Sequence, residues 1–229
     1  MSAGGAVPGG EPEPAGGERG FWEGGGRYRA SDDPVVTLFA AQRVRYLEQI
    51  GALGDVATLL DVGAGNGFSS RSWPARVHVT ACDYARGMLA GNPVRDRLVT
   101  SAYALPFRDA AFDAVSCWEL LHHVDDPVAA VREMLRVARR RVLIFEPNRV
   151  NPGHVWLALT RAEERRCLRF SPRYVRRLVQ AAGGRLHVHV RCGLLFPNIT
   201  PLAVARLLVR LPFRAPLVAI SQLVVAERA

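Results

Sequence analysis

Three glycines that alternate with other residues follow an apolar segment and an acid, and together they could bind a nucleotide-type cofactor. The stretch Leu-Leu-Asp-Val-Gly-Ala-Gly-Asn-Gly occupies residues 59–67. Its apolar residues suit a buried parallel strand, and the glycines let the backbone turn sharply and approach a ligand with no Cβ in the way. Phe68 stands where the dinucleotide fingerprint needs its last glycine, which disfavours NAD and FAD. For the loop alone, the alternative is a glycine-rich turn without a ligand.

A second acid stands at the distance from this loop at which a ribose would lie. Asp83 closes the alternating apolar run at 77–82 and follows Asp61 by about 20 residues. A carboxylate at that spacing can accept hydrogen bonds from the ribose hydroxyls of an adenosine laid across the strand ends. The acids and the glycines therefore predict one adenosine-binding site.

Further motifs follow in a fixed order along the chain. They are Ala-Leu-Pro-Phe at 104–107, Phe-Asp-Ala-Val at 112–115, Leu-Leu-His-His-Val at 120–124, Glu133 with Arg136 and Val137, and Val-Leu-Ile-Phe-Glu-Pro-Asn at 142–148. In this order and spacing the chain resembles the class I S-adenosylmethionine-dependent methyltransferases, in the small-molecule branch that includes the ubiquinone and menaquinone methylases. The resemblance covers roughly residues 35–148 and implies that the cofactor is S-adenosylmethionine.

The resemblance also implies which residues hold this cofactor. The loop from Gly63 to Gly65 would line its amino-acid end, Asp83 would take the ribose hydroxyls, and Tyr84 and Met88 would pack near the adenine. The family usually has Asp-Ala after the third strand, whereas this chain has Ser101-Ala102, and a serine accepts a hydrogen bond without charge. The full set of predicted cofactor-binding residues is Asp61, Gly63, Ala64, Gly65, Asp83, Tyr84, Met88, Ser101, Ala102 and Trp118.

Two side chains are candidates for catalysis. Methyl transfer from a sulfonium is an in-line displacement, so positioning can supply most of the rate. His123, expected at the end of the fourth strand, could accept a proton from a hydroxyl or ammonium nucleophile near neutral pH. Alternatively, His122 and His123 begin a helix and one of them only caps or packs. Glu146 could orient an amine or hydroxyl, or hold a lid through an ion pair with an arginine.

Strand-like and helix-like segments alternate from residue 56 onward, which predicts an α/β fold. Strands are expected at 57–61, 77–82, 97–100, 113–118, 141–146, 185–191 and 218–226, with helices at 34–50, from about 67, and at 85–91, 127–138 and 171–182. The predicted fold is a Rossmann-like, seven-stranded, mostly parallel sheet with helices on both faces and an antiparallel last strand. Ligands then bind at the carboxyl ends of the strands, where the following residues fall: Asp61, Asp83, Ser101, Trp118 and Glu146.

One domain with a tail is expected from a length of 229 residues. Residues 1–26 hold almost nothing apolar before Phe21, which predicts a disordered N-terminal extension, with the methyltransferase domain over 27–229. Lid insertions are expected near 147–170 and 193–216. The arginines of the first lid would suit a substrate that carries a carboxylate or phosphate; they are Arg149, Arg161, Arg165, Arg166 and Arg169.

The strongly basic composition could suggest a nucleic-acid partner, but the details disfavour one. The net charge is +9, and all 30 basic residues are arginine, which indicates the coding bias of a GC-rich genome. The Pro-Pro and Pro-Cys motifs of nucleic-acid methylases do not occur after the fourth strand. Arg132, Arg136, Arg139 and Arg140 are interpreted as a solvated helix face.

The cysteines and histidines predict no metal site. Four cysteines are scattered without a C-x-x-C pair, so buried thiols in a reducing cytosol are expected. His187 and His189 share a strand face but have no third ligand nearby, and a structural role is expected for both. Three arginines interrupt the apolar stretch at 202–225, so stable membrane insertion is not expected.

The expected function is an S-adenosylmethionine-dependent O- or N-methyltransferase that acts on a small metabolite, in specialised, antibiotic-type biosynthesis. The first alternative is C-methylation of a polyprenyl quinone-type substrate, with the segment 201–218 on a membrane surface. The second alternative is a non-catalytic or NAD-binding Rossmann-like protein. The expected location is the cytoplasm, and a homodimer is compatible with the sequence.

Overall fold

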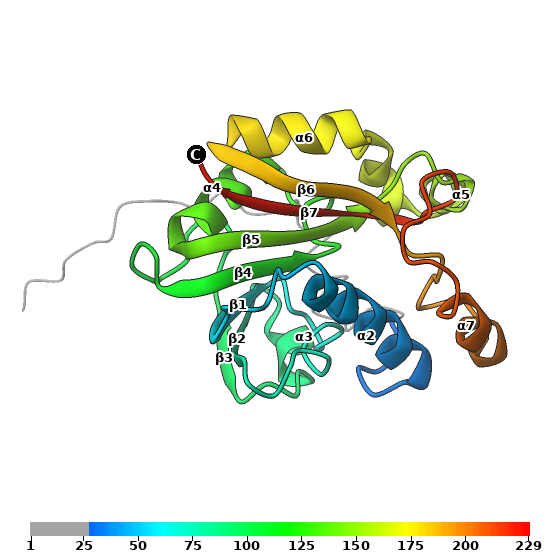
Figure 1. Cartoon of the computed structure of the whole chain (residues 1–229), viewed down its shortest axis with the longest axis horizontal. Helices are drawn as coiled ribbons and strands as arrows, with labels where there is room; N and C mark the ends of the chain where they lie inside the picture. The colour runs from blue at the N-terminus through cyan, green and yellow to red at the C-terminus, as the bar shows by residue number, and fades with distance from the viewer. Residues whose placement is uncertain (1–27) are drawn as a thin grey trace, which may run out of the picture.

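The computed structural model describes residues 28–229, so the extension expected over residues 1–26 lies outside the described residues (Figure 1). Seven strands form one sheet in the order β3-β2-β1-β4-β5-β7-β6. Their bounds are β1 Thr58–Val62, β2 His78–Asp83, β3 Asp96–Val99, β4 Phe112–Trp118, β5 Ala138–Pro147, β6 Gly184–Cys192 and β7 Ser221–Arg228. The strands β1 to β5 pair in parallel, and β7 runs antiparallel to both of its neighbours. The predicted sheet is therefore confirmed.

The central strands are buried on both faces, and successive side chains enter two different cores. Leu60, Val115 and Ile144 pack on one face with the helices α4 (Pro127–Val137) and α6 (Pro172–Ala181). Their sequence neighbours, such as Leu59 and Leu143, pack on the other face with α2 (Pro34–Gln49). This alternation with a period of two places helices on opposite sides of the sheet, as Figure 1 shows.

The helix starts follow the capping chemistry of the sequence. The side chain of Asp33 accepts a hydrogen bond from the backbone N–H of Val35 at 2.7 Å, with Pro34 in the first helical position. Ser171 caps α6 in the same way, ahead of Pro172. The short helix α3 covers Arg86–Ala90.

The helix expected from about residue 67 is absent, and this segment forms consecutive turns instead. Contacts of Gly67, Ser69 and Ser70 hold it in this conformation. Gly67 has a φ of +93°, and a Cβ there would overlap the Pro93 ring. The hydroxyls of Ser69 and Ser70 both turn inward to the buried carboxylate of Asp61. These contacts replace the regular helical pattern between β1 and β2.

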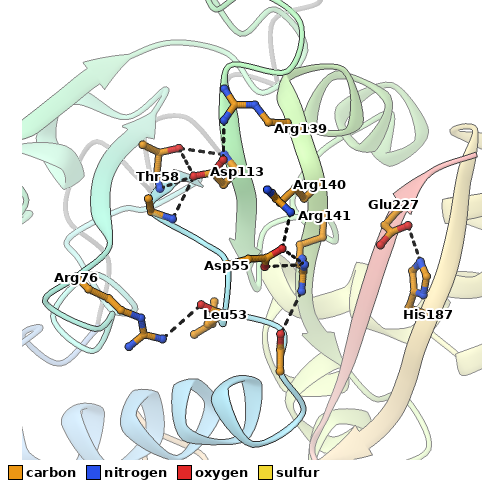
Figure 2. A network of polar contacts seen from close by, with 12 residues as sticks. Leu53, Asp55, Thr58, Arg76, Asp113, Arg139, Arg140, Arg141, His187 and Glu227 are labelled. Atoms are coloured by element: carbon orange, nitrogen blue, oxygen red, sulfur yellow. Dashed lines mark hydrogen bonds and ion pairs between the residues drawn. The ribbon is translucent and has the colours of Figure 1, made fainter.

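The interpretation of Arg139 and Arg140 as part of a solvated helix face is wrong, because α4 ends at Val137 and β5 begins at Ala138. Both arginines, with Arg141, form ion pairs at the amino-terminal edge of the sheet (Figure 2). Their partners are Asp113 and Asp55. Local strand pairing with β4 decides the conformation here, whereas the sequence shows only a run of charges.

Two lid segments lie beyond the other end of the sheet, where β5 and β6 end (Figure 1). The first contains α5 (Pro152–Thr160) and the 3-10 helix η1 (Ala162–Arg169), and the second contains α7 (Leu202–Leu208). All four cysteines are free and buried, as expected. Among the described residues, no helix is long and apolar enough to cross a membrane.

Candidate functional site

A cavity opens at the carboxyl ends of β1, β2 and β4 and beneath the two lid segments. The glycine loop, the end of β2, the segment after β4 and the two lid segments all contribute to its lining. The lining residues are Tyr28, Phe39, Gly63, Ala64, Gly65, Asn66, Phe68, Asp83, Tyr84, Met88, Trp118, Glu119, Leu120, His122, His123, His154, Leu157, Arg161, Glu164, Phe196, Pro197, Asn198, Ile199 and Ile220.

The glycine loop has the geometry that the sequence predicts. Gly63 and Gly65 both have positive φ angles, of 70° and 48°, which residues with a side chain rarely adopt. A Cβ on Gly65 would lie 3.3 Å from Met88 Cε and 4.0 Å from Asp83 Oδ2. A side chain at this position would therefore crowd Met88, and glycine lets the loop backbone approach the two residues expected to meet the adenosine. These residue types are compatible with the predicted cofactor.

Asp83 connects the glycine loop to the helix that follows β2. One carboxylate oxygen accepts a hydrogen bond from the backbone N–H of Gly65, and the other accepts one from Ala85, both at 2.8 Å. Asp83 thus holds the loop in addition to its predicted contact with the ribose.

Eight of the predicted site residues line the cavity and four do not. The lining group contains Gly63, Ala64, Gly65, Asp83, Tyr84, Met88, Trp118 and His123. The other predicted residues are Asp61, Ser101, Ala102 and Glu146. The hydroxyl of Ser101 accepts a hydrogen bond from the backbone of Tyr103 at 3.2 Å, and Ala102 packs against the core on the α4 side of the sheet. Their proposed contact with adenine stays a prediction.

Asp61 lies behind the glycine loop, with 1% of its surface exposed. Its carboxylate accepts hydrogen bonds from Ser69 and Ser70. Burial raises the pKa of Asp61 to about 6, although these hydroxyls favour the charged form. This acid stabilises the loop from behind.

Glu119, which the sequence analysis did not single out, lines the cavity directly after β4. Its φ is +55°, which is uncommon for a residue with a side chain and turns it out of the strand direction. Burial raises the pKa of Glu119 to about 7. Ser221 donates a hydrogen bond to it at 3.3 Å, and the buried Arg43 donates to Ser221 at 2.7 Å. The sequence gives no signal for this positive φ.

Glu146 lies inside the protein and contacts the side chain of His122. It is fully buried, and one of its oxygens accepts hydrogen bonds from the backbone N–H groups of Leu120 and Leu121 at 2.9 and 2.6 Å. The other oxygen lies 2.8 Å from His122 Nδ1. Burial opposes charge on this ring, yet Cys167 and Glu146 raise the pKa of His122 well above its usual value. Glu146 therefore orients His122 instead of facing the cavity.

His123 faces the cavity, and its ring centroid lies 3.9 Å from that of His122. Burial and the nearby charges of His122 and Arg166 lower the pKa of His123 well below its usual value. The ring is therefore neutral near pH 7, as a proton acceptor must be, but it is a weak base. Neither histidine begins a helix, because the next helix begins at Pro127.

The lid contributes a third histidine to the cavity. His154 on α5 is 7% exposed, and neither ring nitrogen makes a hydrogen bond of standard geometry within residues 28–229. Burial lowers the pKa of His154 to about 4, so the ring is neutral. Its ring packs 5.0 Å from that of Phe196 on the second lid segment. The backbone of Ile220 bonds to this ring and partly offsets the effect of burial. The ring also lines the cavity, which makes His154 a candidate hydrogen-bond partner for a ligand.

The match with a known family covers the glycine loop, Asp83 and the segment after β4, and it ends before the lid segments. A family model described as a methyltransferase domain matches residues 60–145. This part of the chain is a class I S-adenosylmethionine-dependent methyltransferase domain. The cofactor of the domain is S-adenosylmethionine, and the glycine loop and Asp83 fall within the matched residues.

Curated relatives of the methyltransferase domain match over part of their length. The demethylmenaquinone methyltransferase of Renibacterium salmoninarum is 38% identical over 120 residues, which is 49% of this chain and 50% of that protein. The ubiquinone biosynthesis O-methyltransferase of Nitrosomonas europaea is 33% identical over 114 residues, or 45% of this chain and 48% of that protein. The chain thus spans about half the length of the curated relatives that it matches.

A solved structure shares the fold over more of the chain. The S-adenosylmethionine-dependent methyltransferase of Thermotoga maritima, described as a possible histamine N-methyltransferase, has a TM-score of 0.61 and 16% identity. The match covers 83% of this chain and 93% of that one. At this identity the match supports the fold and carries no information on the substrate.

Proposed function

We propose that this chain transfers the methyl group of S-adenosylmethionine to an oxygen or nitrogen atom of a small molecule. The observation that carries this proposal is the cavity itself. Its lining combines the glycine loop and Asp83 with an acid of positive φ and with histidines. The residues that would hold the cofactor and those that could bind and deprotonate an acceptor therefore line the same cavity.

Bound S-adenosylmethionine supplies an electrophilic methyl group, so the chain has to position and deprotonate the acceptor. Glu119 and His123 both face the cavity from the segment after β4. The pKa of Glu119, about 7, lies close to working pH, which suits a general base better than the low pKa of His123 does. We therefore add Glu119 to His123 as a candidate proton acceptor, and we assign Glu146 the role of a positioning residue.

The substrate-binding side is formed by the lids. Of the five lid arginines predicted to meet an acidic substrate, Arg161 lines the cavity. Arg149 and Arg166 bond to other parts of the protein, including the Leu168 carbonyl and Asp125. His154 offers a neutral ring nitrogen to the substrate. A small metabolite with one acidic group and one further hydrogen-bonding group suits this arrangement.

Calorimetry and a transfer assay test the proposal in sequence. The full chain should bind S-adenosylmethionine and should not bind NAD, which would dismiss the reading as an NAD-binding protein. Incubation with pools of phenols, hydroxy acids and amines should then yield S-adenosylhomocysteine together with a product that is heavier by one methylene unit. A chain that binds no S-adenosylmethionine would refute the proposed function.

A quinone-type acceptor is the second candidate, favoured by the apolar surface around the lids. Among residues 28–229, the exposed large apolar side chains fall almost entirely between positions 150 and 218, and Trp156, Leu159 and Leu217 are 58%, 71% and 83% exposed. Leu157, Phe196 and Ile199 continue this surface into the cavity. An aromatic head inside the cavity with an apolar tail along the lids would fit this arrangement.

The two candidates give different products. The chain can be offered a reduced, short-chain demethylmenaquinone and a polar phenol without a tail. Methylation of a ring carbon, identified by NMR, would favour the quinone reading, whereas methylation of the phenol oxygen alone would favour the small-metabolite reading. The specialised, antibiotic-type setting stays a prediction from the sequence.

A further inference from the structure

Three metal-ligating side chains converge at the border of the cavity, outside the expected cofactor side. They are His122, after β4, and Glu164 and Cys167 on η1. One donor atom of each lies within 4.8 Å of the others, with 3.2 Å between Cys167 Sγ and Glu164 Oε2 and 3.8 Å between His122 Nε2 and Glu164 Oε2. We call these residues the lid trio.

The 3-10 conformation of η1 brings two members of the lid trio together. Side chains three positions apart align in a 3-10 helix, which has three residues per turn. Glu164 and Cys167 stand at this spacing, and both turn toward the sheet, with 17% and 1% of their surface exposed. In an α-helix the same pair would be offset around the helix axis.

The histidine of the lid trio is oriented as a ligand. Its Nδ1 atom lies 2.8 Å from Glu146, whose other oxygen is fixed by two backbone N–H groups. Nε2 is then left to face Glu164. Histidines that bind metals almost always donate the other ring N–H to a carboxylate or carbonyl in this way, because it fixes the tautomer and the ring orientation.

The spacing of the lid trio can be compared with that around a tetrahedral zinc ion. Bonds of about 2.0–2.3 Å from zinc to nitrogen, oxygen and sulfur place neighbouring ligand atoms about 3.3–3.6 Å apart. The two distances to Glu164, 3.2 and 3.8 Å, lie close to this range. Small side-chain rotations would therefore bring the three atoms onto one ion.

The donor types point to zinc among the common ions. A thiolate is a soft ligand that disfavours magnesium and calcium, and the combination of sulfur, imidazole and carboxylate suits zinc. The thiolate and the carboxylate would together neutralise the two charges of the ion. Other histidine–acid pairs in the described chain differ, because His78–Asp96 and His187–Glu227 are exposed on the surface and belong to no such trio.

We propose that His122, Glu164 and Cys167 bind one zinc ion, with its fourth position open to the cavity. His122 and Glu164 both line the cavity, so a ligand could reach that position. Three protein ligands and one open position are typical of catalytic rather than structural zinc sites. If the proposed function holds, the ion would bind and orient the acceptor oxygen. This proposal departs from the prediction of no metal site, which considered only short cysteine and histidine spacings.

Metal binding is tested on the full chain with zinc and with cobalt as a spectroscopic probe. After removal of metals with a chelator, the wild-type chain should take up one zinc ion, measured by competition with a coloured chelator. Cobalt should give intense visible bands typical of tetrahedral coordination and an ultraviolet band from the thiolate. The substitution Cys167→Ser should abolish the ultraviolet band and strongly weaken zinc binding. Glu146→Gln, which removes the partner of His122, should weaken zinc affinity less, by about 10–100-fold.

Matched controls separate the lid trio from non-specific binding. Cys82→Ala removes another buried thiol, and His187→Gln removes another histidine beside an acid; both should leave the cobalt spectrum unchanged. If Cys167→Ser fails to fold, Glu164→Gln, at a partly exposed position, should still weaken zinc binding. Absence of zinc uptake by the wild-type chain, or uptake that none of the three positions affects, would overturn the proposal.

The failure of this proposal can be distinguished from failure of the proposed function. Calorimetry with S-adenosylmethionine is repeated on the metal-free chain. If the chain takes up no zinc, the lid trio is not a metal site. If the same chain still binds S-adenosylmethionine and transfers its methyl group, the proposed function as a methyltransferase stands. In that case His122, Glu164 and Cys167 form a hydrogen-bonded cluster that fastens the lid.

Discussion

The two edges of the sheet hold polar side chains in opposite ways. At the amino-terminal edge, Asp113 accepts hydrogen bonds from Ala57, from the backbone and hydroxyl of Thr58, and from Arg139, at distances of 2.7–3.1 Å (Figure 2). These bonds and the arginine hold the pKa of Asp113 below its usual value, even though burial opposes them. The acid is therefore charged and fully bonded.

At the carboxyl-terminal edge, the polar groups that line the cavity have fewer partners: Glu119, which is partly exposed, accepts a hydrogen bond from Ser221. Burial raises the pKa of Glu119 to about 7 and lowers that of His154 to about 4, and Glu119 has a positive φ. Groups of this kind lower the stability of a fold. We interpret the contrast as a division of roles, in which the amino-terminal edge contributes stability and the carboxyl-terminal edge is the proposed place of binding and chemistry.

The largest predicted effect on activity is expected at Glu119, and its absence would contradict the comparison of the two edges. Glu119→Gln should lower kcat by about 10²–10⁴-fold, because it removes a proton acceptor at the cavity. The same substitution should change the thermal midpoint little or raise it, because it removes a carboxylate that burial disfavours. Steady-state kinetics and thermal unfolding measure the two effects.

His123→Ala is the matched variant for this prediction. If Glu119 is the base, His123→Ala should lose less activity than Glu119→Gln, with little change in affinity for the cofactor. A loss of 10²–10⁴-fold in His123→Ala together with near-normal Glu119→Gln would move the assignment to His123. If both variants stay fully active, positioning alone drives the reaction and neither residue is a base.

At the amino-terminal edge, the expected loss is in stability and not in catalysis. Asp113→Ala leaves the N–H groups of Ala57 and Thr58 and the Arg139 guanidinium without their acceptor, so the free energy of unfolding should fall by about 2–4 kcal/mol. Denaturant unfolding gives this value, and kcat per folded molecule should be unchanged.

Asp55→Ala provides the control within the same edge. Asp55 pairs with Arg140 and Arg141, but its side chain is 41% exposed, so the loss should stay below about 1 kcal/mol. Equal losses at Asp55 and Asp113 would mean that burial does not govern the energetics of this edge.

A smaller effect is expected at Asp83, which belongs to the cofactor side of the cavity. Asp83→Asn should weaken the binding of S-adenosylmethionine by tenfold or more, because charge-assisted bonds to hydroxyls contribute about 1.5–3 kcal/mol each. Asp96→Asn, an exposed acid paired with His78, should not change the affinity. Unchanged affinity in Asp83→Asn would contradict the assignment of the ribose site.

The sequence predicts the conformation of the glycine loop and the place of Asp83 beside it, because both depend on local chemistry. Gly63 and Gly65 adopt positive φ angles where alternating glycines follow an apolar strand. Asp83 then lies beside Gly65, since parallel strands end at the same edge. Both features depend on residues that are adjacent in the chain or one strand apart, and such patterns are visible in a linear sequence.

The part of the cavity that is lined by the segment after β4 and by the lids could not be predicted in the same way. The positive φ of Glu119 has no signal in residue type, because glycine or asparagine is expected in that conformation. Cys167 approaches His122 only through the 3-10 form of η1, and a charged segment does not distinguish this helix from an α-helix. Likewise, Glu146 falls at a strand end as predicted, but its partner is His122 and not a ligand.

The smallest predicted effect concerns the pH dependence of the amino-terminal edge. Because folding lowers the pKa of Asp113, its contribution to stability is complete above the unfolded pKa of about 4 and is lost as the pH falls through the lower, folded pKa. Other acids titrate in the same range, so the informative quantity is the difference in unfolding free energy between the wild type and Asp113→Asn. This difference should be constant from pH 7 to pH 5 and should shrink below pH 4. A difference that stays constant down to pH 2.5 would show that Asp113 is not held charged by its four partners, and the contrast between the two edges would then rest on geometry alone.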